Sequence, residues 1–440
     1  MEIIIHRGAK QVGGTCIEIS SGTSRILLDF SLPLSFEFGD DIESLLPRPL
    51  FDELTNGTKK VDAVFLSHAH LDHYGLAGFL PSQIPIFLSN ATKRIMAFSE
   101  KFTPNKIGAI NTVEFHSYSP VQVGEITITP FLMDHSAFDA HGFLVESGGK
   151  SIFYTGDFRG HGLNKSLTSK LAGKLPDIDI LLMEGTIIGE RENDFFQTEE
   201  EIKTKFVETC REFSGPVLVS VPSQNIDRII SLYRATVGTG RNLIIDLYSA
   251  ELFNRLSEFT LDLPQAGGKN VSVWYPLIQR ENLAQDQLFW VMKKHKPYKQ
   301  PLSELAKESK NPVILLRPPF RKEIGRHFDL SKAVWVYSMW TGYLERSQAL
   351  QRLKEWTLEN SIPFRLLHTS GHAKLDDLKE FVTSLSPKRL IPVHSFHPEQ
   401  YSQYFENVSI FGDNERFFVS NERTWANNAN SAEAKSRATD

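Results

Sequence analysis

Short apolar runs separated by glycine, serine and asparagine fill the first third of the chain. The clearest of these runs are 3–5, 16–19, 26–30 and 63–66. Runs of this length between turn-forming residues are typical of β-strands joined by tight turns. Three later runs, 126–132, 151–154 and 178–183, each lead into a polar residue. The pattern therefore predicts a strand-rich region with candidate functional side chains at the ends of its strands.

From residue 191 to residue 360 the apolar positions alternate between helical spacing and short runs. Thr198 and Glu201 form a capping box ahead of a helical pattern that runs from Ile202 to Phe213. A run at 217–220, a second helical pattern at 226–233 and a run at 243–245 follow, and runs at 313–316 and 334–337 continue the series. Strands that alternate with helices through short connections form parallel sheets. We therefore predict a separate α/β lobe here.

Composition and charge exclude some classes of protein. The chain has 440 residues, 41% of them hydrophobic, which is enough for one large core or two of ordinary domain size. Its formal net charge of -5 excludes a protein that coats nucleic acid through overall positive charge, so any nucleic acid must bind in a local groove. Cys16 and Cys210 are the two cysteines, and they provide neither a disulfide framework nor a cysteine-based zinc site.

The sequence gives no sign of a membrane-associated protein. Its first eight residues have no basic stretch that leads into an apolar segment of secretory length. No run approaches the ~20 apolar residues that a membrane span needs. We expect no membrane association and a cytoplasmic location.

Gly13 and Gly14 interrupt the first strands of the chain. Neither a lysine-bearing phosphate loop nor the start of a helix follows them. We interpret them as turn residues and not as part of a nucleotide-binding loop.

The densest group of potential metal ligands directly follows the run at 61–66. His68, His70, Asp72 and His73 lie within six residues of one another. In an extended segment His68 and His70 project to the same side, and a turn into a helix would bring the other two to a neighbouring point. That arrangement suits two adjacent metal ions. The alternative is a set of surface or capping histidines.

The His-x-His-x-Asp-His pattern of these residues resembles the defining element of the metallo-β-lactamase superfamily. The resemblance implies an α/β fold, a metallo-β-lactamase αββα sandwich. It also implies two later ligands, which match His135 and Asp157, each placed after a strand run. Alone, either residue would be a cap or turn residue, but their order and their positions at strand ends favour metal binding. Asp157 would bridge the two metals.

The resemblance implies two zinc ions, and manganese is also compatible with these ligands because thiolates are absent. One ion would be held by His68, His70, His135 and Asp157, and the other by Asp72, His73, Asp157 and a late histidine. Two ions roughly 3.5–4 Å apart can lower the pKa of a shared water, polarise a phosphoryl oxygen and stabilise the leaving oxygen. We therefore expect a hydrolase.

An inserted α/β lobe followed by further histidine motifs resembles the β-CASP nucleases, a group that includes ribonuclease J and the pre-mRNA 3′-end processing endonuclease. Glu184 matches the first of three motifs of the group, an acidic residue, and would orient a ligating histidine. His372 matches the second and would protonate the leaving oxygen or stabilise charge on the phosphorane-like transition state. His394 matches the third and would be the late histidine ligand. DNA-acting members have valine there, so the resemblance favours RNA, and we assign catalysis to Asp72, His372 and Glu184.

The same resemblance divides the chain into segments. The first part of the metallo-β-lactamase core would span 1–190, the β-CASP insertion lobe 191–360 and the completing part of the core 361–420. Residues 421–440 are polar and poor in apolar residues, and we expect them to be disordered.

Substrate contacts are expected on both lobes. Ser223, Asn225 and Arg228 resemble a turn that contributes to a pocket for an RNA 5′ phosphate, although a plain helix start explains them equally well. The resemblance adds His368, Ser370 and Gly371. Trp340 either stacks on unpaired bases in the cleft or belongs to the core. We expect single-stranded RNA as the partner and leave a homodimer open.

The leading hypothesis is thus a zinc-dependent ribonuclease, with endonuclease and 5′-to-3′ exonuclease action both open. One alternative is a DNA nuclease of the same fold. A second is a small-molecule thioesterase or lactamase, which the large insertion disfavours. The third is a metal-free RNA-binding scaffold.

Overall fold

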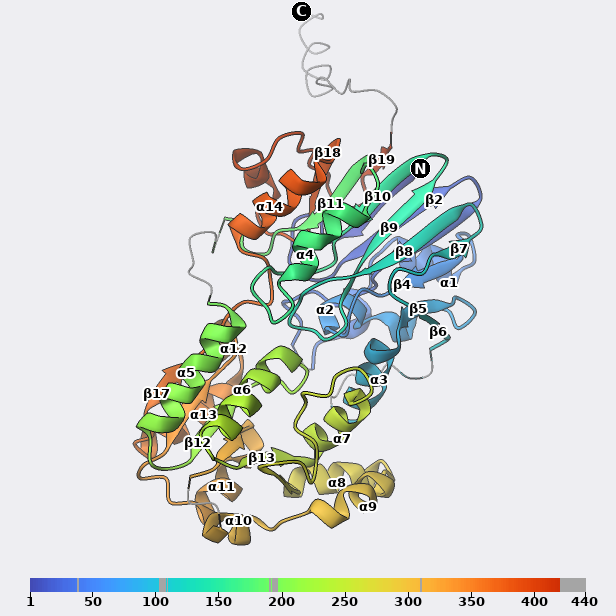
Figure 1. Ribbon diagram of the computed structural model, residues 1–440. Coiled ribbons are helices and arrows are strands. Elements are labelled where there is room, and N and C mark those ends of the chain that lie inside the picture. Colours follow the sequence, from blue (N-terminus) through green and yellow to red (C-terminus); the bar gives the residue numbers. More distant parts are fainter. Residues whose placement is uncertain are drawn as a thin grey trace, which may run out of the picture.

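The computed structural model describes residues 1–37, 39–102, 108, 110–189, 191, 197–308 and 311–419. These residues form three β-sheets with helices packed on their faces (Figure 1). The tail expected at 421–440 lies outside the described residues.

The first two sheets contain the strands of the two ends of the chain. The first sheet has seven strands in the order β19-β1-β2-β3-β4-β5-β6. They are β1 (Glu2–Arg7), β2 (Cys16–Ser21), β3 (Ser24–Leu28), β4 (Ala63–Phe65), β5 (Ile86–Ser89), β6 (Thr112–Phe115) and β19 (Arg416–Phe418). The second sheet has six strands in the order β18-β11-β10-β9-β8-β7. They are β7 (Val121–Val123), β8 (Ile126–Leu132), β9 (His141–Ser147), β10 (Lys150–Tyr154), β11 (Ile180–Glu184) and β18 (Arg389–Val393).

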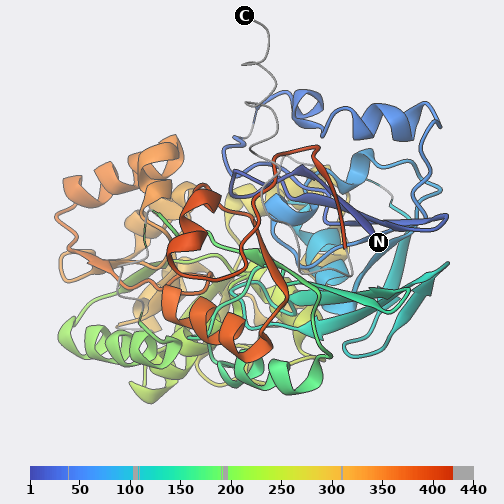
Figure 2. The same ribbon diagram turned by 90° about the horizontal axis from the view of Figure 1, so that it is seen from above.

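These two sheets pack face to face as a sandwich (Figure 2). Side chains alternate along each strand, so Ile26 and Leu28 of β3 face the layer between the sheets while Leu27 faces outward. Phe143 and Ile152 of the second sheet complete the same buried layer. Burial on both faces explains why these strands appear in the sequence as nearly continuous apolar runs.

Helices cover the two outer faces of the sandwich (Figure 2). On the first sheet lie α1 (Leu50–Thr55), α2 (Leu71–Tyr74) and α3 (Asn90–Ser99). On the second sheet lie α4 (Ser166–Leu171) and α14 (Leu375–Leu385), whose Phe381 packs on Phe153 and Phe158. The fold is therefore the αββα sandwich that the sequence predicts.

The third sheet forms the inserted lobe, in the order β14-β13-β15-β12-β16-β17. All of its strand pairs are parallel, as expected for strands connected by helices. The strands are β12 (Val217–Ser220), β13 (Leu243–Asp246), β14 (Val271–Trp274), β15 (Val313–Leu315), β16 (Val334–Tyr337) and β17 (Phe364–Leu366). The helices are α5 (Glu199–Glu212), α6 (Ile226–Gly238), α7 (Leu247–Leu256), α8 (Leu277–Gln285), α9 (Phe289–His295), α10 (Leu302–Glu308), α11 (Arg321–His327), α12 (Gly342–Arg346) and α13 (Gln348–Glu359).

Several local predictions are confirmed. Thr198 and Glu201 form the reciprocal capping box of α5, and Ile202, Phe206 and Cys210 are buried along one face of that helix. The sequence patterns did not single out β5, β6, β7, β9, β14 or β19. The expected insertion, 191–360, ends before β17. Because β17 pairs with β16 of the third sheet, we propose that the inserted lobe extends to Leu366 and that the core resumes after it.

Among the described residues, no helix combines the length and apolar character that a membrane crossing requires.

Candidate active site

Seven candidate ligands gather at one edge of the sandwich. They are His68, His70, Asp72, His73, His135, Asp157 and His394, in two groups whose ligand atoms lie within 4.8 Å of one another. Strands β8, β10, β11 and β18 point in the same direction, so the residues that follow them meet at one edge of the second sheet. The residues after β4 face them from the first sheet.

The backbone after β4 explains how one short motif supplies four ligands. The chain stays extended as far as His70, which has φ −96° and ψ 144° and occupies the N-cap position of α2. Asp72 and His73 then lie in the single turn of α2. The predicted change from extended chain to helix is therefore present.

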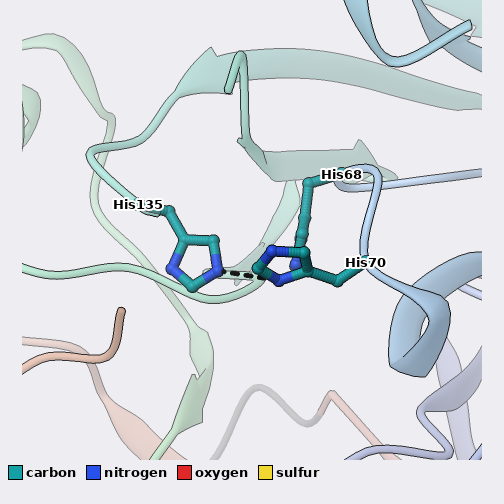
Figure 3. A group of neighbouring side chains, drawn as sticks. All are labelled: His68, His70 and His135. Atoms are coloured by element: carbon teal, nitrogen blue, oxygen red, sulfur yellow. Dashed lines mark hydrogen bonds between the residues drawn. The ribbon is translucent and has the colours of Figure 1, made fainter. Parts of the chain in front are cut away.

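The first group consists of His68, His70 and His135 (Figure 3). Nε2 of His135 lies 3.3 Å from Nδ1 of His70, and the two rings point toward each other. Nδ1 of His135 donates to the carbonyl oxygen of Gly371 at 2.5 Å. Because a carbonyl can only accept, this bond places the proton on Nδ1 and leaves Nε2 available as a ligand atom.

Asp157 lies between the two groups. Its carboxylate oxygens are 3.1 Å from His73 Nε2, 3.6 Å from His394 Nδ1, and 3.9 Å from both His68 Nε2 and His135 Nε2. The side chain of Asp157 is buried. A carboxylate placed in this way lies within reach of both groups.

The electrostatics of the cluster favour neutral imidazoles in the first group. Burial, followed by the neighbouring histidines, lowers the pKa of His68 well below its ordinary value. Burial also lowers the pKa of His135, against the opposing effect of Asp157. Metal binding requires unprotonated imidazole, so both rings are in the form that binds a cation. For His73, Asp157 and Asp29 outweigh burial and raise the pKa.

Three buried atoms of the cluster have no hydrogen-bond partner in the described part of the chain. They are Nε2 of His68, Oδ1 of Asp157 and Nε2 of His394. Each unsatisfied buried polar atom costs about 1–3 kcal/mol, more when it is charged. Cations between these atoms would satisfy all three. The donor set of imidazole nitrogens and carboxylate oxygens therefore fits divalent metal ions such as zinc.

Asp29, which follows β3, is a site residue that the sequence patterns did not single out. Its Oδ2 atom lies 2.8 Å from Nδ1 of His73 and accepts from the hydroxyl of Tyr154 at 2.7 Å. Its Oδ1 atom accepts from the backbone N–H of Ser67 at 2.7 Å. Asp29 thus fixes the ring of His73 with Nε2 toward Asp157. The only signal in the sequence was a carboxylate at a strand end.

His394 occupies an unusual backbone conformation. Its φ is 52°, in the left-handed region. The backbone N–H of His394 donates to the carbonyl of Gly8 at 2.8 Å, and the hydroxyl of Thr186 lies 3.0 Å from Nδ1. These contacts hold the ring beside Asp72, whose Oδ2 atom is 3.6 Å from Nε2.

Buried Glu184 and half-buried His372 form a pair beside the ligand cluster. Oε1 of Glu184 lies 3.3 Å from Nδ1 of His372, which is 3.7 Å from Asp157. Although burial opposes it, Glu184 and then Asp157 raise the pKa of His372 to about 9. Glu184 also accepts from the backbone N–H groups of Phe158 and Thr186. It therefore orients His372 and the loop that follows Asp157.

Replacing Glu184 by glutamine is expected to lower kcat for the reaction of this site by roughly 10–100-fold, the usual effect of losing an orienting partner. The amide keeps the size of the side chain but removes the charge that favours protonated His372. The measurement is kcat beside the melting temperature. A variant with wild-type kcat would exclude this role for Glu184.

Arg159 is a second residue that the sequence patterns did not single out. It is fully buried and pairs with Asp134 at 3.5 Å, Glu199 at 3.2 Å and Asp227 at 2.6 Å. It also donates to the carbonyl oxygen of Ser370 at 3.2 Å. Because Asp134 precedes His135 and Glu199 begins α5, this guanidinium connects the ligand cluster to the inserted lobe.

Ser370 and Gly371 lie against the candidate ligands. The hydroxyl of Ser370 accepts from the backbone N–H of His372 at 3.1 Å. A Cβ atom on Gly371 would lie 2.4 Å from Oγ of Ser136 and 3.2 Å from Cε1 of His135, so a larger residue here would displace the Ser136 hydroxyl and press on His135. Both residues position His135 and His372, and their contact with a substrate stays a prediction.

The Ser223, Asn225 and Arg228 set lies in the inserted lobe, and each of these residues makes hydrogen bonds there. Asn225 is the N-cap of α6 and accepts from the backbone N–H of Arg228. The Arg228 guanidinium is fully buried and pairs with Glu199 at 2.8 Å. Ser223 is buried and hydrogen-bonds Ser249 at 2.7 Å. Of the two alternatives that the sequence left open, these contacts favour the helix start.

His368 and Trp340 lie on the lobe side of the site. Burial and then the charge of Arg228 lower the pKa of His368 to about 3. Trp340 is half-buried, contacts Tyr343 at a centroid distance of 5.4 Å and lies under the guanidinium of Arg346. Desolvation and then the charge of Asp72 raise the pKa of Tyr343. This aromatic pair therefore borders the ligand cluster.

Gly13 and Gly14 have positive φ angles of 73° and 70°. A Cβ atom on Gly13 would lie 2.7 Å from the backbone nitrogen of Leu34 and 2.9 Å from Cβ of Asp72. Their interpretation as turn residues fits this geometry, and the turn at Gly13 packs against the candidate ligand Asp72.

Two family models match the chain. A beta-lactamase superfamily domain matches residues 38–212, and a Zn-dependent metallo-hydrolase RNA specificity domain matches residues 364–406. Residues 38–212 therefore resemble a beta-lactamase superfamily domain. The second match adds a segment associated with RNA specificity, and the two together are consistent with a β-CASP ribonuclease.

Similar proteins extend these matches. A probable RNase MJ4 of Methanocaldococcus jannaschii is 29% identical over 52% of this chain and 54% of that protein. A ribonuclease J of Helicobacter pylori is 22% identical over 88% of this chain and 55% of that protein. Ribonuclease J 2 of Streptococcus pyogenes is 21% identical over 94% of this chain and 73% of its own length. The chain thus spans about half the length of the first curated relatives that it matches.

A solved structure shares the fold. The crystal structure of a protein of unknown function from Enterococcus faecalis V583 matches with a TM-score of 0.77 and 22% identity. The match covers 94% of this chain and 99% of that one. It shows the fold alone.

Proposed function

We propose that this protein is a metal-dependent ribonuclease that hydrolyses phosphodiester bonds of RNA with two zinc ions, for which manganese can substitute. One observation carries the proposal: buried Asp157 lies within 3.9 Å of histidines from two separate groups, while its Oδ1 atom has no hydrogen-bond partner among the described residues. A site for a single ion does not need a carboxylate shared between two groups.

We assign the ligands by the geometry of the two groups. One ion would be held by His68, His70 and His135 together with Asp157, which is 3.9 Å from His68 and from His135. The other would be held by Asp72, His73, Asp157 and His394. When bound, such a pair of ions supplies positive charge that polarises a phosphoryl oxygen and acidifies a water molecule.

The chain's own side chains supply the remaining steps. Because the pKa of His372 is raised to about 9, we expect its ring to be protonated at neutral pH. Nδ1 of this ring lies 3.7 Å from Asp157. The ring donates its proton to the oxygen that leaves phosphorus when the bond breaks, and Glu184 holds the ring for the transfer. Asp29 and Gly371 fix His73 and His135 in the orientations that binding requires.

RNA is the substrate that the comparisons favour. The model matched at residues 364–406 is described as an RNA specificity domain, and the similar proteins are named as ribonucleases. The Trp340 and Tyr343 pair provides aromatic faces on which unpaired bases stack, which favours single-stranded RNA. Homodimer formation and a cytoplasmic location stay predictions from the sequence.

The direct test incubates the zinc-loaded or manganese-loaded protein with labelled single-stranded RNA and with DNA of the same sequence. We expect RNA to be cleaved and DNA to persist, and we expect Asp72→Ala to leave the RNA intact. Preferential DNA cleavage would favour the DNA nuclease. Intact RNA with both the wild type and Asp72→Ala would contradict the proposal.

Endonuclease action and 5′-to-3′ exonuclease action both stay open, and a circular RNA separates these two modes. Cleavage of the circle demonstrates endonuclease action because a circle has no end. Degradation confined to linear 5′-monophosphorylated RNA would instead assign the site to 5′-to-3′ exonuclease action.

A further inference from the structure

The far end of the inserted lobe exposes a cluster of positive charge. Lys293, Lys294, Lys296 and Lys299 lie on α9 and the turn after it, and all four are exposed. The sequence has no aspartate or glutamate from residue 287 to residue 303. Among the described carboxylates, none forms an ion pair with Lys293, Lys296 or Lys299.

Exposed aromatic rings accompany the lysines. Phe289 is 56% exposed, Trp290 45% and Tyr298 44%. Large exposed aromatic side chains beside lysines offer flat surfaces within reach of positive charge. Buried Val291 and His295 anchor α9 to the lobe, so the exposed rings are not needed for its packing.

A chain of contacts connects the candidate active site to α7. Phe138 follows the candidate ligand His135 by three residues, and its ring lies 6.4 Å from that of Phe259, which is 41% exposed. The guanidinium of Arg94 in α3 lies 5.2 Å from the centre of the Phe259 ring. Arg94 also donates to the carbonyl oxygen of Arg255 in α7 at 2.9 Å.

A further contact connects α7 to α9. The guanidinium of Arg255 lies 5.4 Å from the centre of the Trp290 ring. Figure 1 shows α3 next to the sandwich, α7 below it and α9 farther along the lobe, and α7 contacts both of these helices. A strip of alternating aromatic and basic residues therefore extends from Phe138 to the lysine cluster. Within it Arg94 pairs with Glu258 at 2.7 Å and Arg255 with Glu251 at 2.9 Å, so among the described residues the positive charge without a carboxylate partner lies at the lysine end.

The chemistry of this strip identifies its occupant. Aromatic faces interleaved with basic groups bind single-stranded nucleic acid, because bases stack on the rings and phosphates meet the positive charges. A protein partner would favour an interface depleted in lysine, so four exposed lysines argue against one. The strip is also continuous with the site at which the strand would be cut.

We propose that the surface formed by Phe138, Phe259, Arg94, Arg255, Trp290, Lys293 and Lys296 binds the part of a single-stranded RNA that lies beyond the cleaved bond. This inference rests on the proposed ribonuclease function. It adds a second binding region, outside the metal cluster, that selects long unpaired RNA over short fragments.

The test compares steady-state kinetics of the metal-loaded protein on a long unstructured RNA and on an oligonucleotide that spans only the metal cluster. The variant combines Trp290→Ala, Lys293→Ala and Lys296→Ala. We expect KM for the long RNA to rise by about 10-fold or more, with kcat unchanged and the short substrate unaffected. The dependence of log kcat/KM on log salt is expected to become shallower by about 0.7 for each lysine that contacted a phosphate.

Two matched variants separate a specific effect from general loss of charge. Lys322→Ala with Lys354→Ala removes two exposed lysines from α11 and α13 of the same lobe, and we expect wild-type KM. Trp290→Phe keeps an aromatic face and should restore most of the affinity that Trp290→Ala loses.

Unchanged KM for the long RNA in the strip variant would overturn the inference, and so would equal losses in the control variant. Crosslinking of the wild-type protein to long RNA provides a check that does not depend on whether a variant folds. We expect crosslinked peptides from residues 289–299, and their absence would count against the strip. If the wild type cleaves neither RNA, the proposed function fails, and the crosslinking result still decides the inference.

Discussion

Asp157→Ala is expected to reduce RNA cleavage by at least ~10³-fold. The carboxylate lies between both ligand groups, so its loss removes a contact from each proposed ion at once. Charge stabilisation by bound metal contributes several kcal/mol to a transition state, and each ~1.4 kcal/mol corresponds to a tenfold change in rate. The measurement is the single-turnover cleavage rate at saturating metal.

Asp376→Ala is the matched control for this variant. Asp376 is an exposed carboxylate in the first turn of α14, outside the ligand cluster, and its removal should leave the rate within a factor of about two. Retention of wild-type cleavage by Asp157→Ala would show that the reaction does not pass through this cluster.

Arg228→Ala is expected to destabilise the protein by about 3–5 kcal/mol. The buried carboxylate of Glu199 would lose one of its two cationic partners and keep only Arg159. Arg228 makes a two-pronged pair with Glu199 and donates to the Ser338 hydroxyl and the carbonyl of Leu367. For a lobe of this size the corresponding fall in melting temperature is at least ~6 °C. Thermal unfolding measures it.

The same variant decides between the two interpretations of the Ser223, Asn225 and Arg228 segment. If Arg228 contacts a 5′ phosphate, its replacement by alanine would raise KM for 5′-monophosphorylated RNA and leave the melting temperature unchanged. Arg326→Ala, which removes an exposed arginine of α11, should change neither quantity. A stable Arg228→Ala protein with weakened recognition of the 5′ end would favour the phosphate pocket over the structural role.

The fold was largely predictable because its strands are buried on both faces. Runs such as 126–132 and 217–220 contain enough apolar residues to indicate a strand without help from neighbours, and the Thr198 capping box marks the start of α5. β17 falls in the segment expected to complete the core, but it lies at the edge of the third sheet, where Phe364, Arg365 and Leu366 are all exposed. Its pairing with β16 is decided by tertiary contacts that a local pattern does not contain.

The candidate site was predictable where one segment concentrates its ligands or where a motif resembles a known family. His68 to His73 form the first case, and His135, Asp157 and His394 the second. Asp29 and Arg159 were not predictable, because each is an isolated charged residue whose role depends on partners distant in the sequence. Asp29 acts through His73, 44 residues away, and Arg159 meets Asp227, 68 residues away.

Arg228 shows the opposite difficulty. Its motif suggested a surface pocket, yet its side chain is fully buried. The explanation is Glu199 at the start of α5, which pairs with both Arg228 and Arg159. Two cations around one buried carboxylate form a structural network that local sequence cannot distinguish from a phosphate site.

The most direct test of the two-metal centre is the number of ions bound per chain when metal-free protein is titrated with zinc and the bound metal is determined by elemental analysis. The geometry around Asp157 predicts two ions in the wild type and a loss of at least one in Asp157→Ala. A wild-type chain that binds no more than one zinc ion, or an Asp157→Ala chain that still binds two, would contradict the account.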